Sequence, residues 1–144
     1  ISSTNWTERL GPACSVAFLK KHMKLNLGKI LIKNGSKIRK IWEKNAKKNN
    51  LKIDISGILP LSSFKILNVD WPLVLTFFIQ EMMDKKILAS DRCYSNYAQK
   101  DKYLLKYDAA CDEAFYKINK FTNNETIKSK LRGPIKQMGF HRLT

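Results

Sequence analysis

The chain has 144 residues and carries 27 Lys and Arg against 12 Asp and Glu, which gives a formal net charge of +15. This length fits one domain, and a hydrophobic content of 44% is enough for a core, which argues against a disordered chain. No apolar run approaches the ~18 residues that a membrane span needs. The longest run, Leu73 to Ile79, is interrupted by Thr76. We therefore expect a globular domain without a membrane segment.

The positive charge comes mainly from lysine. Of the 27 basic residues, 22 are Lys and five are Arg, although the planar guanidinium of Arg is the group favoured for recognising phosphates and base edges. The lysines are accompanied by 14 Ile and 11 Asn, a composition typical of proteins encoded by AT-rich genomes. We interpret most of the charge as compositional drift and expect no nucleic-acid partner. The alternative is a functional surface that binds a polyanion.

Cysteine and histidine show no pattern that would bind a metal. Cys14, Cys93 and Cys111 are widely spaced and contain neither a CxxC pair nor a disulfide framework. We interpret them as reduced thiols of a cytoplasmic protein. His22 and His141 have no Cys, Asp or Glu at ligand spacing, so we predict no metal site.

Two helices are predicted in the first third of the chain. Residues Gly11 to Lys24 combine apolar and small residues with a basic end, which suits a helix C-terminus and a tightly packed helix. From Leu27 to Lys48, apolar residues recur at steps of three, four and seven, with lysines on the other side, which predicts an amphipathic helix. Asn34-Gly35 lowers the helical propensity at its centre and favours a kink or a break there.

A hairpin and a third helix follow. Apolar and polar residues alternate from Leu51 to Ile55 and again from Phe64 to Asn68, on either side of a turn at Gly57 to Leu61, which predicts two antiparallel strands. Asp70 is suited to be an N-cap, and Pro72 suits the first turn, so a helix is predicted from there to about Lys85.

The second half is predicted to add one strand and one long helix. Ile87 to Ala89 is expected to be a short strand, Ser90 to Tyr97 a polar loop, residues 100–120 a helix and Glu125 to Leu131 a helical turn. The long helix is expected to bury Leu104, Leu105, Cys111, Phe115 and Ile118. This order predicts an α+β domain in which a small antiparallel sheet is covered by helices.

Motifs for catalysis are absent from the sequence, which contains no GxGxxG, no P-loop and no GxSxG. Glu81 and Asp84 lie three residues apart on a predicted helix next to lysines. We interpret them as salt-bridge partners and not as a catalytic pair of acids. The residues alone therefore do not define a complete active site.

Four segments, in order, resemble the C-terminal part of class-III, fold-type-I aminotransferases, which are pyridoxal-phosphate enzymes and include glutamate-1-semialdehyde aminomutase. They are Ser2 to Ala13 (SSTNWTERLGPA), Thr76 to Met83 (TFFIQEMM), Ile87 to Ser90 (ILAS) and Gly139 to Thr144 (GFHRLT). The resemblance implies the small C-terminal domain of that architecture, formed by residues 26–144. Residues 1–25 would link it to a large cofactor-binding domain.

The resemblance also implies a cofactor contact. In such enzymes the first segment begins with a hydroxyl and an amide that bind the phosphate of pyridoxal phosphate held by the neighbouring subunit of a homodimer. Ser3-Thr4 matches that position, and a hydroxyl with a backbone N–H just before a helix suits a phosphate. The alternative is that Thr4 is an ordinary loop or capping residue.

A second implication concerns the substrate. Family members place a substrate-facing side chain just after the short strand, and the acidic residue found there in the aminomutases is matched by Tyr94, with Arg92 two residues earlier. This departure favours transamination between an amino donor and a carbonyl acceptor over isomerisation of the glutamate-1-semialdehyde 2,1-aminomutase type. The alternatives are a packing role for Tyr94 and an ordinary surface position for Arg92.

The resemblance assigns no catalytic residue to this chain. In these enzymes the Schiff-base lysine lies in the large domain, which would place it before Ile1, and none of the 22 lysines matches it. The chain also starts at Ile1 and not at Met. We therefore expect a fragment that is inactive alone, closes the active site and contributes one phosphate contact. The alternatives are a stand-alone basic module that binds nucleic acid and a structural domain whose helix faces mediate assembly.

Overall fold

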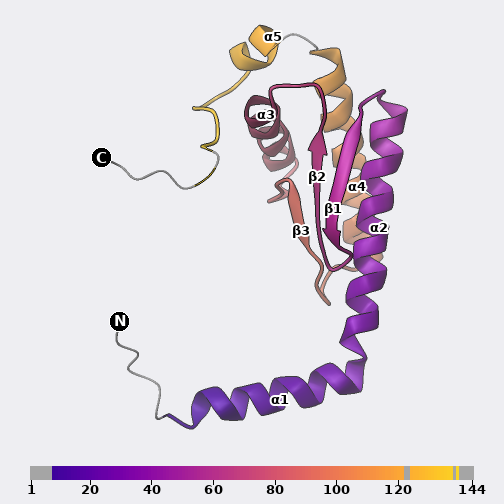
Figure 1. Cartoon of the computed structure of the whole chain (residues 1–144), viewed down its shortest axis with the longest axis vertical. Coiled ribbons are helices and arrows are strands. Elements are labelled where there is room, and N and C mark those ends of the chain that lie inside the picture. The colour runs from indigo at the N-terminus through magenta and orange to yellow at the C-terminus, as the bar shows by residue number, and fades with distance from the viewer. Residues whose placement is uncertain (1–7, 122–123, 138, 140–144) are drawn as a thin grey trace.

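The computed structural model describes residues 8–121, 124–137 and 139, which form an α+β arrangement (Figure 1). In chain order the elements are α1 (Leu10–Leu25), α2 (Leu27–Lys48), β1 (Ile53–Ile58), β2 (Leu61–Ile66), α3 (Trp71–Asp84), β3 (Arg92–Tyr94), α4 (Asp101–Lys120) and α5 (Asn124–Ser129). The strands form one antiparallel sheet in the order β1-β2-β3. The predicted fold class is confirmed.

The first helix stands apart from the rest of the domain. α1 ends at Asn26, whose φ of 48° lies in the left-handed region that Asn tolerates, and α2 starts at the next residue. Figure 1 shows α1 projecting away from the sheet and from the other helices. None of its residues is buried, and Phe18 is 60% exposed. The prediction of a tightly packed helix was wrong, because small residues permit close packing but do not supply a neighbour.

The predicted amphipathic helix is confirmed as α2, and it runs without a break through Asn34 and Gly35. A Cβ atom at Gly35 would lie 1.8 Å from the carbonyl oxygen of Leu59. The glycine therefore serves the close approach of two backbone segments and does not interrupt the helix. The Asn34 side-chain amide donates hydrogen bonds to the carbonyl oxygens of Asn96 (3.0 Å) and Gln99 (3.2 Å), which fixes the loop before α4.

The antiparallel hairpin is confirmed, with Ile55 opposite Phe64 in the register of β1 and β2. The turn is shorter than predicted, because Gly57 and Ile58 belong to β1 and Leu61 belongs to β2. The prediction of a strand at residues 87–89 was wrong. Ile87 and Ala89 pack against the core without pairing in the sheet, and the third strand lies at Arg92–Tyr94, inside the segment expected to be a loop. Apolar residues that pack beside a helix produce the same local pattern as a short strand.

An aromatic cluster centred on β2 forms the middle of the core. The ring of Phe64 lies 4.9 Å from Trp42, 5.3 Å from Phe78 and 5.7 Å from Phe115, measured between ring centroids. These rings come from α2, α3 and α4, so the three helices meet on one face of the sheet. Leu105, which we expected to be buried, is 70% exposed because it lies on the outer side of α4.

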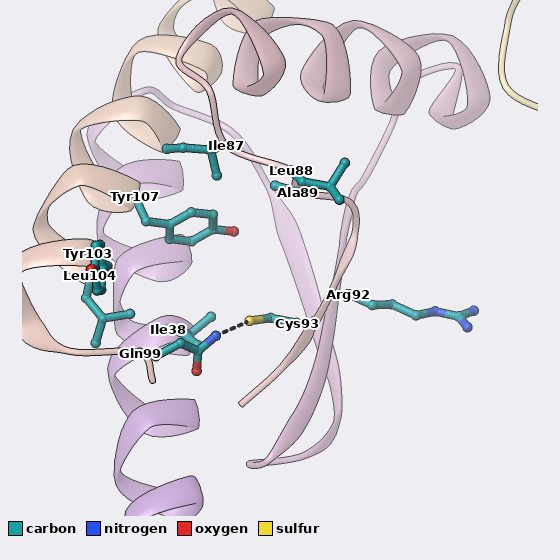
Figure 2. Close-up of a pocket in the computed structure, with 10 residues that line it drawn as sticks. All are labelled: Ile38, Ile87, Leu88, Ala89, Arg92, Cys93, Gln99, Tyr103, Leu104 and Tyr107. Atoms are coloured by element: carbon teal, nitrogen blue, oxygen red, sulfur yellow. Dashed lines mark hydrogen bonds between the residues drawn. The ribbon is translucent and has the colours of Figure 1, made fainter. Parts of the chain in front are cut away.

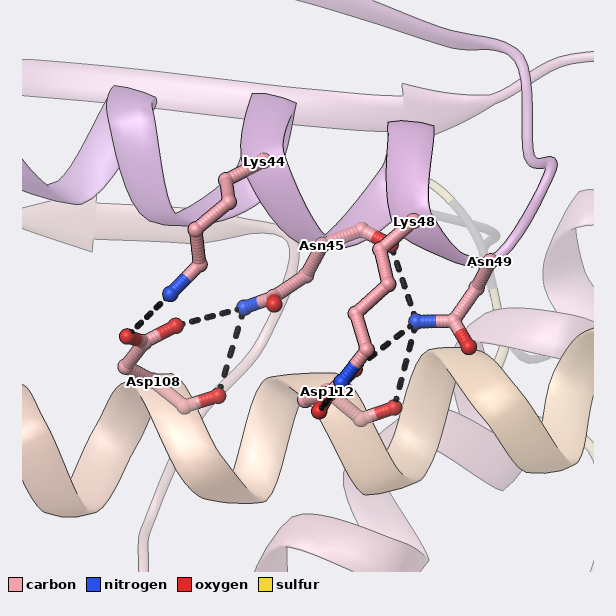
Figure 3. A network of polar contacts seen from close by, with 6 residues as sticks. All are labelled: Lys44, Asn45, Lys48, Asn49, Asp108 and Asp112. Carbon is pink, nitrogen blue, oxygen red and sulfur yellow. Dashed lines mark hydrogen bonds and ion pairs between the residues drawn. The ribbon is translucent and has the colours of Figure 1, made fainter.

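Polar side chains join α2 and α4, which run in the same direction (Figure 3). Lys48 Nζ lies 2.5 Å from Asp112 Oδ2, and Lys44 pairs with Asp108 in the same way. The amides of Asn45 and Asn49 donate to the same two carboxylates. Part of the lysine surplus is therefore neutralised between helices.

The interpretation of the acidic pair on α3 is confirmed. Glu81 accepts from Lys117 at 2.6 Å, and Asp84 accepts from Arg132 at 2.6 Å.

The helices of the described part of the chain include none that is long and apolar enough to cross a membrane. Within the same residues, His, Cys, Asp and Glu form no group of three that could hold a metal ion.

Candidate functional site

The sheet has one face packed on helices and one open face. Along β2, Phe64 and Ile66 are buried, whereas Leu61 and Lys65 are exposed, because successive side chains point to opposite faces. The side chains that share the outward direction therefore come from alternate residues of all three strands.

Arg92 and Tyr94 lie together on this open face. The register places Arg92 opposite Ser63 and Tyr94 opposite Leu61, both of which point outward. The Arg92 side chain is 66% exposed and Tyr94 is 67% exposed. Figure 2 shows the Arg92 side chain pointing away from the pocket behind β3. Tyr94 is therefore not part of the core, and both side chains are available to a ligand.

Two hollows adjoin these side chains. The first, which we call the strap hollow, has a volume of about 370 Å³. It is lined by Ser90, Asp91, Arg92, Tyr94, Lys136, Gln137 and Gly139. The second, which we call the hairpin hollow, has a volume of about 270 Å³. It is lined by Ser56, Gly57, Ile58, Leu61, Ser62, Ser63, Arg92 and Tyr94. Arg92 and Tyr94 are shared by both, so they separate a charged hollow from a more apolar one.

The strap hollow is completed by residues 130–137, which we call the C-terminal strap. Gln80 on α3 donates to the carbonyl oxygen of Lys130 (3.0 Å) and accepts from the backbone N–H of Arg132 (2.9 Å). Thr76, one turn earlier on α3, accepts from the backbone N–H of Lys136 (2.8 Å). These contacts tie the strap along one side of α3 and carry Lys136 to the strap hollow.

A chain of polar contacts crosses the hollow. Lys136 Nζ lies 3.5 Å from Ser90 Oγ, and Ser90 Oγ donates to Asp91 Oδ1 at 2.7 Å. Arg92 Nε is 4.0 Å from Asp91 Oδ2, at the outer limit of an ion pair. Most hydrogen-bond donors of the Arg92 guanidinium and the Lys136 ammonium are therefore free of this network, and they can bind an anion.

A separate pocket of about 190 Å³ lies behind β3 and contains the thiol of Cys93 (Figure 2). Burial raises the pKa of Cys93, against a smaller opposing effect of the Gln99 hydrogen bond. Burial also raises the pKa of Cys111 to about 12. Both thiols therefore stay protonated at neutral pH. Since Cys93 is the cysteine that lines this pocket, the pocket offers no activated nucleophile.

The chain provides no enclosed lysine that could anchor a cofactor covalently. All 22 lysines are described by the structure, and each is exposed or half-buried. The predicted phosphate-binding residues Ser3 and Thr4 lie outside the described residues. The structure thus brings together the two expected substrate-facing residues and leaves the expected cofactor contact undescribed.

Sequence reasoning missed Ser90, Asp91 and Lys136. Ser90 and Asp91 were part of a segment interpreted as a polar loop, and Lys136 lies in the tail, 46 residues beyond Ser90. One signal was present: Thr76, Gln80 and Asp84 repeat at four-residue steps on a helix whose other residues, except Glu81, are apolar. Such a polar row on a buried helix indicates a segment packed along it.

Comparisons with known proteins identify the fold. The sequence matches no protein-family model and no curated protein. The structure is similar to the FumI protein of Sphingopyxis sp. MTA144, solved in its pyridoxal-phosphate (PLP) internal aldimine form, with a TM-score of 0.75 and 12% identity. The match covers 92% of this chain and 31% of FumI, so the chain spans about a third of that protein. The chain has the fold of one part of this pyridoxal-phosphate protein.

Proposed function

We propose that this chain is the small domain of a class-III, pyridoxal-phosphate-dependent aminotransferase. In this proposal residues 26–144 form the domain that closes the active site, and residues 1–25 connect it to a large cofactor-binding domain. The observation that carries the proposal is the fold shared with part of FumI, a protein solved with pyridoxal phosphate. The four sequence segments that resemble class-III enzymes support the same assignment independently of the structure.

In this proposal the substrate binds at the open face of the sheet. Arg92 and Tyr94 are more than half exposed on that face and stand between two hollows. A side chain that closes an active site must face outward from its own domain, as these two do. We propose that the reaction is transamination between an amino donor and a carbonyl acceptor. Isomerisation of the aminomutase type remains the alternative for the same domain.

The cofactor would be held mainly by residues outside this domain. Because none of its lysines is enclosed, we propose that the Schiff-base lysine belongs to the large domain and that this chain is inactive alone. Its own contribution would be Ser3 and Thr4, which bind the cofactor phosphate of the neighbouring subunit in a homodimer. A cytoplasmic location and the absence of a nucleic-acid partner belong to the same proposal.

The phosphate contact can be tested in a protein that is extended upstream to include the large domain. Replacement Thr4→Ala removes one hydrogen bond to a charged group, worth about 1.5 kcal/mol, which corresponds to roughly tenfold weaker binding of pyridoxal phosphate. Replacement Thr7→Ala removes a nearby hydroxyl and is the matched control. Equal affinities of the two variants would contradict the role of Thr4.

A further inference from the structure

We propose that the pocket behind β3 is a binding site for a small neutral ring molecule that carries one hydroxyl group. We call it the rear pocket. Ala89 and Cys93 line one side of it, and Leu104 and Tyr107 of α4 line the other (Figure 2). Since Cys93 lies between two outward-facing residues of β3, its side chain points to the opposite face of the sheet. The rear pocket is therefore separate from the face assigned to the substrate, and the inference does not rest on the proposed function.

Small side chains leave the space for this pocket. Cys93 is the inward-facing residue of β3, and it lies opposite the buried Ser62 of β2. Ala89, just before β3, also packs against the core. The next inward residue of β2, Phe64, packs its large ring against both α2 and α4. The helices therefore cannot close over the smaller side chains, because the ring beside them keeps the layers apart.

The volume of the rear pocket fits one ring. It measures about 190 Å³, and an engineered protein cavity of about 150 Å³ is large enough to bind benzene. The walls are mainly apolar: Ile38 and Leu104 are buried, and Leu88 at the edge of the pocket is 94% exposed. A bound ring would remove part of this apolar surface from water, which favours binding. A six-membered ring with one substituent is therefore the size of ligand that the pocket accepts.

The polar groups that face the rear pocket are uncharged. Among the described residues that line it, Arg92 alone carries a charge, and Figure 2 shows its side chain pointing away from the pocket. Burial raises the pKa of the Cys93 thiol and of the Tyr107 hydroxyl, so both stay protonated at neutral pH. A charged ligand would leave water without gaining a partner of opposite charge, which is costly. The ligand is therefore neutral.

Two side chains can bind the hydroxyl group of the ligand. The Tyr107 oxygen accepts from the indole N–H of Trp42 at 2.8 Å, which leaves a second lone pair for the O–H of a ligand. The Gln99 amide donates to Cys93 Sγ at 3.5 Å and to the carbonyl oxygen of Tyr94 at 3.4 Å. Both distances are long for hydrogen bonds, so this amide can turn to a ligand oxygen at little cost. A hydroxyl both donates and accepts, and it therefore suits both side chains.

The test is a titration of the 144-residue chain with phenol at neutral pH, followed through the backbone amide resonances by NMR. Toluene has the same shape without the hydroxyl, and benzoate has the same ring with a charge. Phenol is expected to shift the resonances of Ala89, Cys93 and Tyr107 in a saturable manner and to bind about fivefold more tightly than toluene. Benzoate is expected to shift the same resonances only at concentrations at least about tenfold higher.

Variants locate the bound ring. Ala89→Leu fills the rear pocket and should weaken phenol binding at least about tenfold. Ala17→Leu, at an exposed position of α1, is the matched control and should leave binding unchanged. Tyr107→Phe removes the oxygen that accepts from the ligand, so phenol should lose most of its advantage over toluene.

Several outcomes would overturn the inference. Equal affinities for phenol and toluene would show that the hydroxyl is not recognised, and benzoate binding as tight as that of phenol would exclude a neutral site. Unchanged phenol binding in Ala89→Leu would place the ligand elsewhere. If Ala89→Leu does not fold, Tyr107→Phe decides, and a full preference for phenol in that variant would contradict the site. The titration requires neither pyridoxal phosphate nor an amino donor, so its result is independent of the proposed function.

Discussion

The indole N–H of Trp42 donates a 2.8 Å hydrogen bond to the hydroxyl oxygen of Tyr107, which joins α2 to α4 at the side of the aromatic core. Trp42 is fully buried, so its N–H has no access to water. The contact joins the two helices that, together with β3, line the pocket behind the strand that presents Arg92 and Tyr94.

Replacement Tyr107→Phe removes the acceptor and leaves the buried N–H of Trp42 unpaired. The free energy of unfolding is expected to fall by about 1 to 3 kcal/mol, the cost of an unsatisfied buried donor. Chemical denaturation monitored by tryptophan fluorescence measures the change. Tyr116→Phe on the same helix, at a side chain that is 56% exposed, is the control and should have little effect. Equal stabilities of the two variants would show that the hydrogen bond contributes nothing.

Replacement Gly35→Ala should destabilise the domain severely. The new methyl group would lie 1.8 Å from the carbonyl oxygen of Leu59, a backbone atom that cannot move aside easily. We expect a loss of at least about 3 kcal/mol. Gly28→Ala in the same helix meets nothing within 4 Å and should be neutral or stabilising by up to about 1 kcal/mol. Thermal unfolding followed by circular dichroism separates the two, and a stable Gly35→Ala variant would contradict the close backbone approach.

The stability of the domain should depend on the charge of Asp112 at acid pH. The Lys48 ammonium, with help from the Asn49 amide, holds the pKa of the Asp112 carboxyl below its ordinary value. An Asp pKa in the unfolded chain is about 3.9. The stabilising contribution is therefore fully present above that pH, and it is lost as the pH falls through the lower pKa of the folded state.

Urea unfolding at a series of pH values from neutral to strongly acid tests this dependence. Asp112→Asn is expected to be less stable than the wild type at neutral pH and to lose less stability on acidification. Lys48→Gln should flatten the profile in the same way, while Lys47→Gln, the exposed neighbouring lysine, should retain the wild-type slope. A profile of Asp112→Asn that parallels the wild type would disprove the pairing.

The three thiols should differ sharply in their reactivity. Cys14 is exposed, Cys93 is partly buried with a raised pKa, and Cys111 is buried with a pKa raised to about 12. With N-ethylmaleimide at neutral pH, Cys14 should be modified first, Cys93 more slowly, and Cys111 only when the protein unfolds. Mass spectrometry of peptides after timed quenching gives the order, and rapid modification of Cys111 in the folded protein would contradict its burial.

Much of the fold could be predicted because a long helix repeats the spacing of its apolar residues over several turns. The apolar spacing of α2 and the cap at Asp70, which accepts from the N–H of Leu73, are local features that the folded chain retains. The strand β3 could not be found in this way, since three residues are too few for a pattern. The exposure of α1 could not be predicted either, because burial depends on which segments lie beside a helix.

Only part of the candidate site could be predicted from the sequence. Arg92 and Tyr94 emerged from resemblance to a family, but Lys136 could not, because no local pattern connects it to Ser90, which lies 46 residues earlier. Its position results from hydrogen bonds between the strap and α3, and such pairings become visible only after the chain is folded.

The most direct measurement of the central claim is an amino-transfer assay on the protein extended upstream to include a large domain. After incubation with pyridoxal phosphate and dialysis, the extended protein should retain the visible absorbance of the bound cofactor and should transfer an amino group from an amino donor to a carbonyl acceptor. The 144-residue chain alone should do neither. An extended protein that binds no pyridoxal phosphate would contradict the assignment of this chain to an aminotransferase.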